Sequence, residues 1–270
     1  MLIDSVARTY SAIWSKLILP LLVGVQLVLG IAVAGSLDAL PDTVERIKPS
    51  IVGVGTFQSS RRPPVSLRGT GFVVGDGHYV LTNLHVIPAK LNNAKLEVLA
   101  VFAGEGESPS VRLAAKVAED AEHDVVLLKF SDEALPAMAL GDSDQVREGQ
   151  LYAFTGFPIG AILGLHPTTH RGIVSAITPD IMPSNSSGEL SAELLSRLKY
   201  SYRVFQLDAT VYPGNSGSPL YDPVTGTVIG VINKVFVQGN NKKNALEKPS
   251  GISFAIPIRY AKALLVKAGL

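Results

Sequence analysis

The stretch that decides the fold is "GTGFVVGDGHYVLTNLHVI", residues 69–87. It contains two short apolar runs, 69–74 and 79–86, with glycine and aspartate between them. Runs of this length, rich in β-branched and aromatic residues and bounded by turn residues, are typical of β-strands. The same pattern recurs along most of the chain, so it sets the expected fold class.

Further strands of this kind are expected on both sides of that stretch. They are "IVGVGTF" (51–57), "KLEVLAVF" (95–102), "VRLAAKV" (111–117), "DVVLLKF" (124–130), "LYAFTGF" (151–157), "HRGIVSAI" (170–177), "YRVFQLDA" (202–209), "GTVIGVINKVF" (226–236) and "GISFAIPI" (251–258). Turn residues separate them at short spacings, which predicts an all-β sandwich or barrel. The polar segment 139–149 lies midway and predicts the junction between two β units.

Two helices are expected at the ends of this β region. Residues 40–50, "LPDTVERIKPS", predict a short helix before the first strand. Residues 258–269, "IRYAKALLVKAG", predict a C-terminal amphipathic helix, because their polar members fall on one face.

The composition excludes several classes of protein. The chain has 270 residues, of which 47% are hydrophobic and 17% charged, which is too apolar for disorder. The formal net charge is +1 and no basic stripe with interleaved aromatic residues is present, so nucleic acid is not an expected partner. There is no cysteine, which excludes disulfides, thiolate metal sites and a cysteine nucleophile.

The N-terminal region predicts export. Residues 17–34 carry no charge, Arg8 and Lys16 precede them, and a small-residue cleavage site follows Ala34. This pattern is typical of a secretory signal peptide over residues 1–34. The alternative is an uncleaved membrane anchor, because about 18 apolar residues are just enough to cross a bilayer.

The stretch "YPGNSGSPLYD", residues 212–222, predicts a tight bend that presents Ser216. Glycine and proline at this density mark a turn, and a plain turn needs fewer of them. A serine hydroxyl is a poor nucleophile until a base removes its proton, so a histidine must lie nearby.

Two residues are the expected partners of that serine. His85 lies at the end of its predicted strand, and of the five histidines it is the strongest candidate for the base. Asp124 opens an apolar strand, and a carboxylate in that position is expected to be partly buried and paired. Asp120 and Asp142 are weaker candidates because each lies in a polar stretch. His85, Asp124 and Ser216 are therefore the predicted catalytic residues.

The order of these three residues favours one class of hydrolase. His, Asp, Ser is the chymotrypsin order, whereas hydrolases with a nucleophile elbow place the serine first. The elbow also requires glycine two positions on either side of the serine; Gly214 fits and Ser218 does not. An elbow-type esterase is thus disfavoured. The backbone amides of Gly214 and Ser216 are the expected oxyanion hole.

From about residue 45 to 265, the chain resembles the HtrA/DegP family of trypsin-fold serine proteases. The resemblance implies two six-stranded antiparallel β-barrels, about 45–140 and 146–258, followed by a helix. Residues 35–270 would then form the protease domain. The stretches that carry the resemblance are the opening stretch with His85, "HDVVLLK", "GDSDQVREGQLYAFTGFPIG", "QLDATVYPGNSGSPLYD" and "GISFAIPI".

The resemblance implies an exported, periplasmic serine endopeptidase that cleaves unfolded or misfolded proteins without metal or cofactor, and that assembles as a homotrimer. Two departures from the family stand out. Ser218 replaces the second glycine of the usual Gly-Asn-Ser-Gly-Gly-Pro, which could crowd the neighbouring strand. The resemblance covers the protease domain only, so no PDZ domain is expected before the last residue, Leu270.

The specificity pocket is expected to include Thr210, Val211 and Asn233. Because Thr210 and Val211 carry no acid, small or aliphatic side chains are expected at the cleavage site, rather than Lys or Arg. The alternative to the protease is a catalytically silent or partner-activated binding or chaperone-like module, in which the site is complete in sequence and misformed at rest.

Overall fold

The structure is a computed structural model that describes residues 39–106, 109–158, 165–180, 202–235 and 251–270. Residues 43–270 form one compact unit. The predicted signal peptide or anchor, residues 1–34, lies outside the described residues. Within the described ranges, no helix is both long enough and apolar enough to cross a bilayer.

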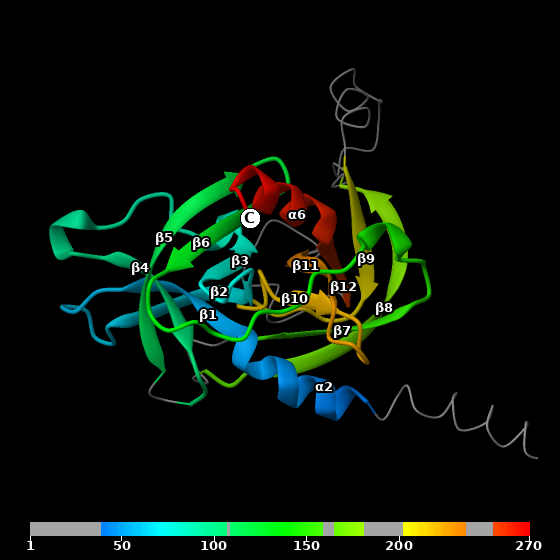
Figure 1. The fold of residues 1–270 in the computed structure, drawn as a ribbon, viewed down its shortest axis with the longest axis horizontal. Coiled ribbons are helices and arrows are strands. Elements are labelled where there is room, and N and C mark those ends of the chain that lie inside the picture. The colour runs from blue at the N-terminus through cyan, green and yellow to red at the C-terminus, as the bar shows by residue number, and fades with distance from the viewer. Residues whose placement is uncertain (1–38, 107–108, 159–164, 181–201, 236–250) are drawn as a thin grey trace, which may run out of the picture. The chain divides into compact units, whose positions relative to one another are not determined.

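The compact unit consists of two closed six-stranded barrels whose paired strands are antiparallel, as predicted (Figure 1). The first barrel has the order β1-β2-β3-β6-β5-β4. Its strands are β1 (Ile51–Phe57), β2 (Val65–Val74), β3 (Tyr79–Asn83), β4 (Val98–Ala103), β5 (Ser110–Asp120) and β6 (Val125–Phe130). The all-β prediction is therefore confirmed for this half of the unit.

The second barrel has the order β10-β11-β12-β9-β8-β7. Its strands are β7 (Leu151–Gly156), β8 (Thr168–Pro179), β9 (Arg203–Asp208), β10 (Pro219–Tyr221), β11 (Val228–Val235) and β12 (Ile252–Pro257). Strand β10 was not among the predicted strands. It is three residues long and directly follows the glycine-rich bend, so it gives almost no local signal.

The helical elements are short. They are α2 (Leu40–Ile47), η1 (Lys48–Ser50), η2 (Leu84–Val86), η3 (Asn93–Lys95), η4 (Ser143–Gln145) and α6 (Ile258–Lys267). Both predicted helices are present at the expected positions. The prediction of one strand over 79–86 was partly wrong, because the chain turns into the 3-10 helix η2 after Asn83.

Each barrel encloses its own core. The first core is built mainly from valine and leucine, and the second contains several aromatic rings. Phe72, Phe102, Phe154 and Phe205 are each at most 2% exposed. Truncating one of them to alanine is expected to cost about 3–5 kcal/mol of unfolding free energy.

One threonine ties the first barrel to the bend that carries Ser216. The Thr70 hydroxyl of β2 donates to the Gly214 carbonyl at 2.7 Å and accepts from the Phe157 amide at 3.0 Å. The Thr70 amide donates to the Ser216 carbonyl at 2.8 Å. Two of these hydrogen bonds hold the bend of the second barrel against a strand of the first, and the third attaches the residue that follows β7 to the same threonine.

Candidate active site

His85 and Asp124 meet at one end of the first barrel. His85 lies on η2, directly after β3, and Asp124 directly precedes β6, the strand that pairs with β3. His85 Nδ1 lies 2.6 Å from Asp124 Oδ2. The His85 backbone amide donates to Asp124 Oδ1 at 2.9 Å. Both carboxylate oxygens thus contact the same histidine, as expected for an acid that orients an imidazole.

The backbone of Asp124 is held in an unusual conformation. Its φ of 51° lies in the left-handed region, which costs free energy for a residue with a side chain. Two groups hold its carbonyl: the Leu84 amide donates at 3.2 Å and the Asn83 side-chain amide at 3.1 Å. These hydrogen bonds from the neighbouring strand end compensate the strain and aim the carboxylate at His85.

Asn233 supplies the third contact to the carboxylate. It lies on β11 of the second barrel, is 8% exposed, and donates from Nδ2 to Asp124 Oδ2 at 2.6 Å. Asn233 is predicted from sequence as part of the specificity pocket, and its hydrogen bond to Asp124 was not predicted. The available signal was an uncharged polar residue that directly follows the apolar run 228–232 of this strand.

The contacts around Asp124 set its charge. Burial raises its pKa, but hydrogen bonds from His85 and Asn233 and the charge of His85 outweigh burial, so the pKa lies below its usual value. The carboxylate is therefore ionised at neutral pH. An ionised acid in this position stabilises the imidazolium form of His85.

The bend before Ser216 is a type II turn. The Asn215 amide donates to the Tyr212 carbonyl at 3.0 Å, with Pro213 and Gly214 at the central positions. Gly214 has a φ of 102°, the left-handed backbone that this turn requires at its third residue and that glycine adopts without a clash.

Two backbone amides of the bend are free to bind an anion. The amides of Asn215, Gly217 and Ser218 donate to backbone carbonyls. In the described part of the chain, no acceptor is bound by the amides of Gly214 and Ser216. A loop with two unpaired amides separated by one residue can bind a developing oxyanion.

The hydroxyl of Ser216 is close to the pair but is not bonded to His85. Its Oγ donates to the Asn233 carbonyl at 3.0 Å. Among the described residues, no hydrogen bond joins it to His85. A Cβ on Gly69 would lie 2.9 Å from the Ser216 carbonyl and 2.7 Å from Val86, so the serine lies beside the segment that carries His85.

Thr210 and Val211, the other two residues of the predicted specificity pocket, directly precede the bend of Ser216. Val211 is 2% exposed and packs in the core of the second barrel, and Thr210 is half-buried. The weaker candidates for the acid have other partners. Asp142 accepts from the Asp144 amide at the start of η4, and Asp120 is paired with His123. Neither competes with Asp124.

The structure accommodates Ser218 without displacing the neighbouring strand. Ser218 is fully buried, and its Oγ lies 2.0 Å from the position that a Cβ would take on Gly156 of β7. A glycine on the facing strand therefore supplies the space that the serine fills. The crowding considered from sequence does not occur, because Gly156 has no side chain.

The family model for the trypsin-like peptidase domain matches residues 69–231. The chain therefore belongs to the trypsin-like peptidases. Within them it is of the HtrA/DegP type, as the sequence resemblance indicated.

In the described residues, no group of three His, Cys, Asp or Glu side chains could hold a metal ion.

The relatives support that assignment. A DegP-like periplasmic serine endoprotease of Halomonas elongata is 31% identical over 193 residues, covering 72% of this chain and 33% of the relative. The serine protease Do-like HtrA of Bacillus subtilis is 28% identical over 242 residues, covering 83% and 47%. The chain thus spans a third to a half of these relatives.

A solved structure shares the fold. The HtrA-type protease AlgW with a tripeptide has a TM-score of 0.59 and 28% identity, covering 84% of this chain and 62% of that one. This likeness agrees with the two-barrel architecture described above.

Proposed function

We propose that the chain is a serine endopeptidase with Ser216 as nucleophile, His85 as base and Asp124 as the orienting acid. The observation that carries the proposal is the convergence of His85 and Asn233 on the Asp124 carboxylate, each at 2.6 Å, beside the bend of Ser216. Family membership supports the same reaction.

The proposed reaction has two stages. His85 takes the proton of the Ser216 hydroxyl as the oxygen attacks the peptide carbonyl carbon, and the amides of Gly214 and Ser216 bind the oxyanion. His85 then gives this proton to the leaving amine as the C–N bond breaks. Water, deprotonated by His85, hydrolyses the acyl-enzyme and restores Ser216. No metal or cofactor takes part in these steps.

The hydroxyl of Ser216 must turn from the Asn233 carbonyl to His85 for the first step. Catalytic hydrogen bonds are often formed only in the substrate complex. The same observation favours the second candidate function, a module whose site becomes active only when a partner binds. Loss of Ser216 would leave such a module's binding function intact.

The substrate and the compartment extend this proposal. Unfolded proteins are the proposed substrate class, with small or aliphatic side chains at the cleavage site near Thr210 and Val211. Export to the periplasm is supported by the relatives' names and by the apolar segment 17–34. Assembly as a homotrimer is proposed by family analogy alone.

The test is cleavage of unfolded casein by the purified chain beside its Ser216→Ala variant. Cleavage by the unmodified chain alone supports the peptidase. If neither cuts, labelling of Ser216 with a fluorophosphonate separates the remaining cases. A labelled serine indicates a formed site that awaits a partner or another substrate, and an unlabelled serine indicates the silent module.

A further inference from the structure

The turn that carries Asp124 holds a second His–Asp pair. His123 Nδ1 lies 2.6 Å from Asp120 Oδ2. The amides of Glu122 and His123 donate to Asp120 Oδ1 at 3.1 and 3.2 Å. Both carboxylate oxygens of Asp120 thus bind the turn between β5 and β6. One of the residues that they bind, His123, directly precedes Asp124.

The ring of His123 is fixed by aromatic residues from the second half of the chain. It stacks on Tyr260 of α6 at 3.9 Å between centroids and 16° between planes. Tyr202, just before β9, meets the ring edge-on at 4.6 Å and also meets Tyr260 edge-on at 5.4 Å. The His123 side chain is only 16% exposed. Asp120 holds one ring nitrogen and two tyrosines hold the ring, so the imidazole has little freedom to move.

The electrostatics join this cluster to the catalytic acid. Burial raises the pKa of Tyr202, and the carboxylates of Asp180 and Asp124 raise it further, so Tyr202 lies within electrostatic reach of Asp124. Burial raises the pKa of Asp120, but its hydrogen bonds from His123 outweigh burial and the pKa is lowered. Asp120 is therefore an anionic anchor for His123.

The position of His123 matters because Asp124 needs a fixed backbone. Asp124 has its φ at 51°, and a residue in that region returns to a commoner conformation unless both of its flanks are held. Its C-terminal flank is the first residue of β6, paired with Asn83. Its N-terminal flank is His123, which no strand holds.

We infer that His123 is a positioning residue, which, clamped between Asp120 and Tyr260, holds the Asp124 carboxylate against His85. The inference rests on the proposed function only where it predicts a change in the rate of peptide cleavage. Because Tyr260 lies on the C-terminal helix α6, this helix helps to position Asp124 through its contact with His123.

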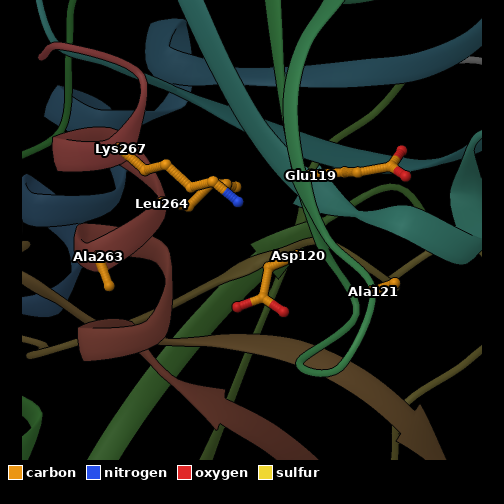
Figure 2. A pocket seen from close by; sticks show the side chains of 6 residues that line it. All are labelled: Glu119, Asp120, Ala121, Ala263, Leu264 and Lys267. Carbon is orange, nitrogen blue, oxygen red and sulfur yellow. The ribbon is translucent and has the colours of Figure 1, made fainter.

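The surroundings of Asp120 supply matched controls. A hollow of about 320 Å³ between the turn and α6 is lined by Glu119, Asp120, Ala121, Ala263, Leu264 and Lys267. Figure 2 shows that the carboxylates of Glu119 and Asp120 point in different directions. Glu119 pairs with Lys116 instead of a histidine. A second control is the exposed pair of His78 and Asp76, 3.2 Å apart in the turn between β2 and β3.

The experiment reads the His85–Asp124 contact directly. His123→Phe keeps an aromatic ring on Tyr260 and removes the bond to Asp120. In proton NMR of the full chain, we expect this variant to lose or broaden the downfield His85 Nδ1–H signal. Asp120→Asn should do the same, whereas Glu119→Gln and His78→Asn should leave the signal unchanged.

Kinetics on a peptide substrate supply the second readout. In His123→Phe we expect kcat to fall about tenfold to hundredfold with KM nearly unchanged, since a misplacement of about 1 Å can cost a hundredfold. His123→Asn, which can still donate to Asp120, should recover part of the rate.

The inference is overturned if His123→Phe and Asp120→Asn keep both the wild-type NMR signal and the wild-type kcat, even when their unfolding temperature falls. That result would assign the pair to stability alone. Since the NMR signal needs no turnover, it tests the positioning role even if the unmodified chain cleaves nothing, which would contradict only the proposed function.

Discussion

The chain holds two His–Asp pairs with the same contact distance, and a single peptide bond joins them. His85 and Asp124 are 39 residues apart and meet where two strands of the first barrel end. His123 and Asp120 are three residues apart within one turn. Both Nδ1–Oδ2 distances are 2.6 Å.

The surroundings of the two pairs differ, and they decide what each pair can do. The His85 side chain is 47% exposed and lies beside the bend of Ser216, whereas that of His123 is 16% exposed and packs against two tyrosines. An imidazole takes up and releases a proton usefully only where a reacting group can reach it. The comparison teaches that a short His–Asp contact alone does not identify a catalytic site.

The largest expected difference between the pairs comes from neutralising each acid. Asp124→Asn should lower kcat about 10⁴-fold, because the His85 ring loses both its tautomer control and the charge that stabilises imidazolium. Asp120→Asn should lower it about a hundredfold at most. Steady-state rates on one peptide substrate measure both. Equal losses in the two variants would contradict the division of roles.

Removing the contact from the second barrel should have an intermediate effect. Asn233→Ala deletes the 2.6 Å hydrogen bond to Asp124 Oδ2, and a bond to a charged group contributes about 1.5–3 kcal/mol. We expect a loss in kcat/KM of about ten- to a hundredfold, measured beside Asn233→Ser. An unchanged rate in the alanine variant would mean that His85 alone holds the carboxylate.

The first pair also depends on the packing under its nucleophile bend. A methyl group on Gly156 would meet the Ser218 hydroxyl, so Gly156→Ala should cost about 1–3 kcal/mol of unfolding free energy. In a Ser218→Gly background the same change should cost less, while Asn215 Oδ1 and Thr70 Oγ1, each 2.8 Å from the added Cβ, still crowd it. Chemical denaturation of the four proteins gives the coupling. Additive effects would contradict the contact between the two positions.

Acid should weaken both pairs, since the pKa values of Asp124 and Asp120 both lie below the usual 3.8. A carboxylate with a lowered folded-state pKa contributes stability that is fully present above its unfolded-state pKa and is lost as pH falls through its folded-state pKa. The free energy of unfolding should therefore decrease below about pH 4.

The asparagine variants assign that acid dependence. Asp124→Asn and Asp120→Asn should each be less stable at pH 7 than the unmodified chain. Their free energy of unfolding should also fall less steeply between pH 4 and 2. Urea denaturation at each pH measures both effects. A variant whose curve runs parallel to that of the unmodified chain would show that its carboxylate has the same pKa in the folded and unfolded states.

Much of the fold could be predicted because its signals are local. Strand β1 has the predicted bounds, Ile51–Phe57, and both helices begin at the predicted residues, Leu40 and Ile258. Strand β10 could not be predicted, because three residues after a bend are too few to show the hydrophobic pattern of a strand. Its place depends on pairing with β7 and β11, which are distant in sequence.

By itself the sequence determined most of the strands and turns, the candidate residues His85, Asp124 and Ser216, and the amides of the bend. Alternating apolar residues and glycine-rich turns act over a few positions, so they can be read without a structure.

Only the tertiary structure decided that Asn233 holds Asp124 across 109 residues, that Gly156 makes room for Ser218, and that His123 is clamped against Tyr260. The physical reason is that barrel closure brings these groups together, and no local pattern records which distant side chain will fill a given space.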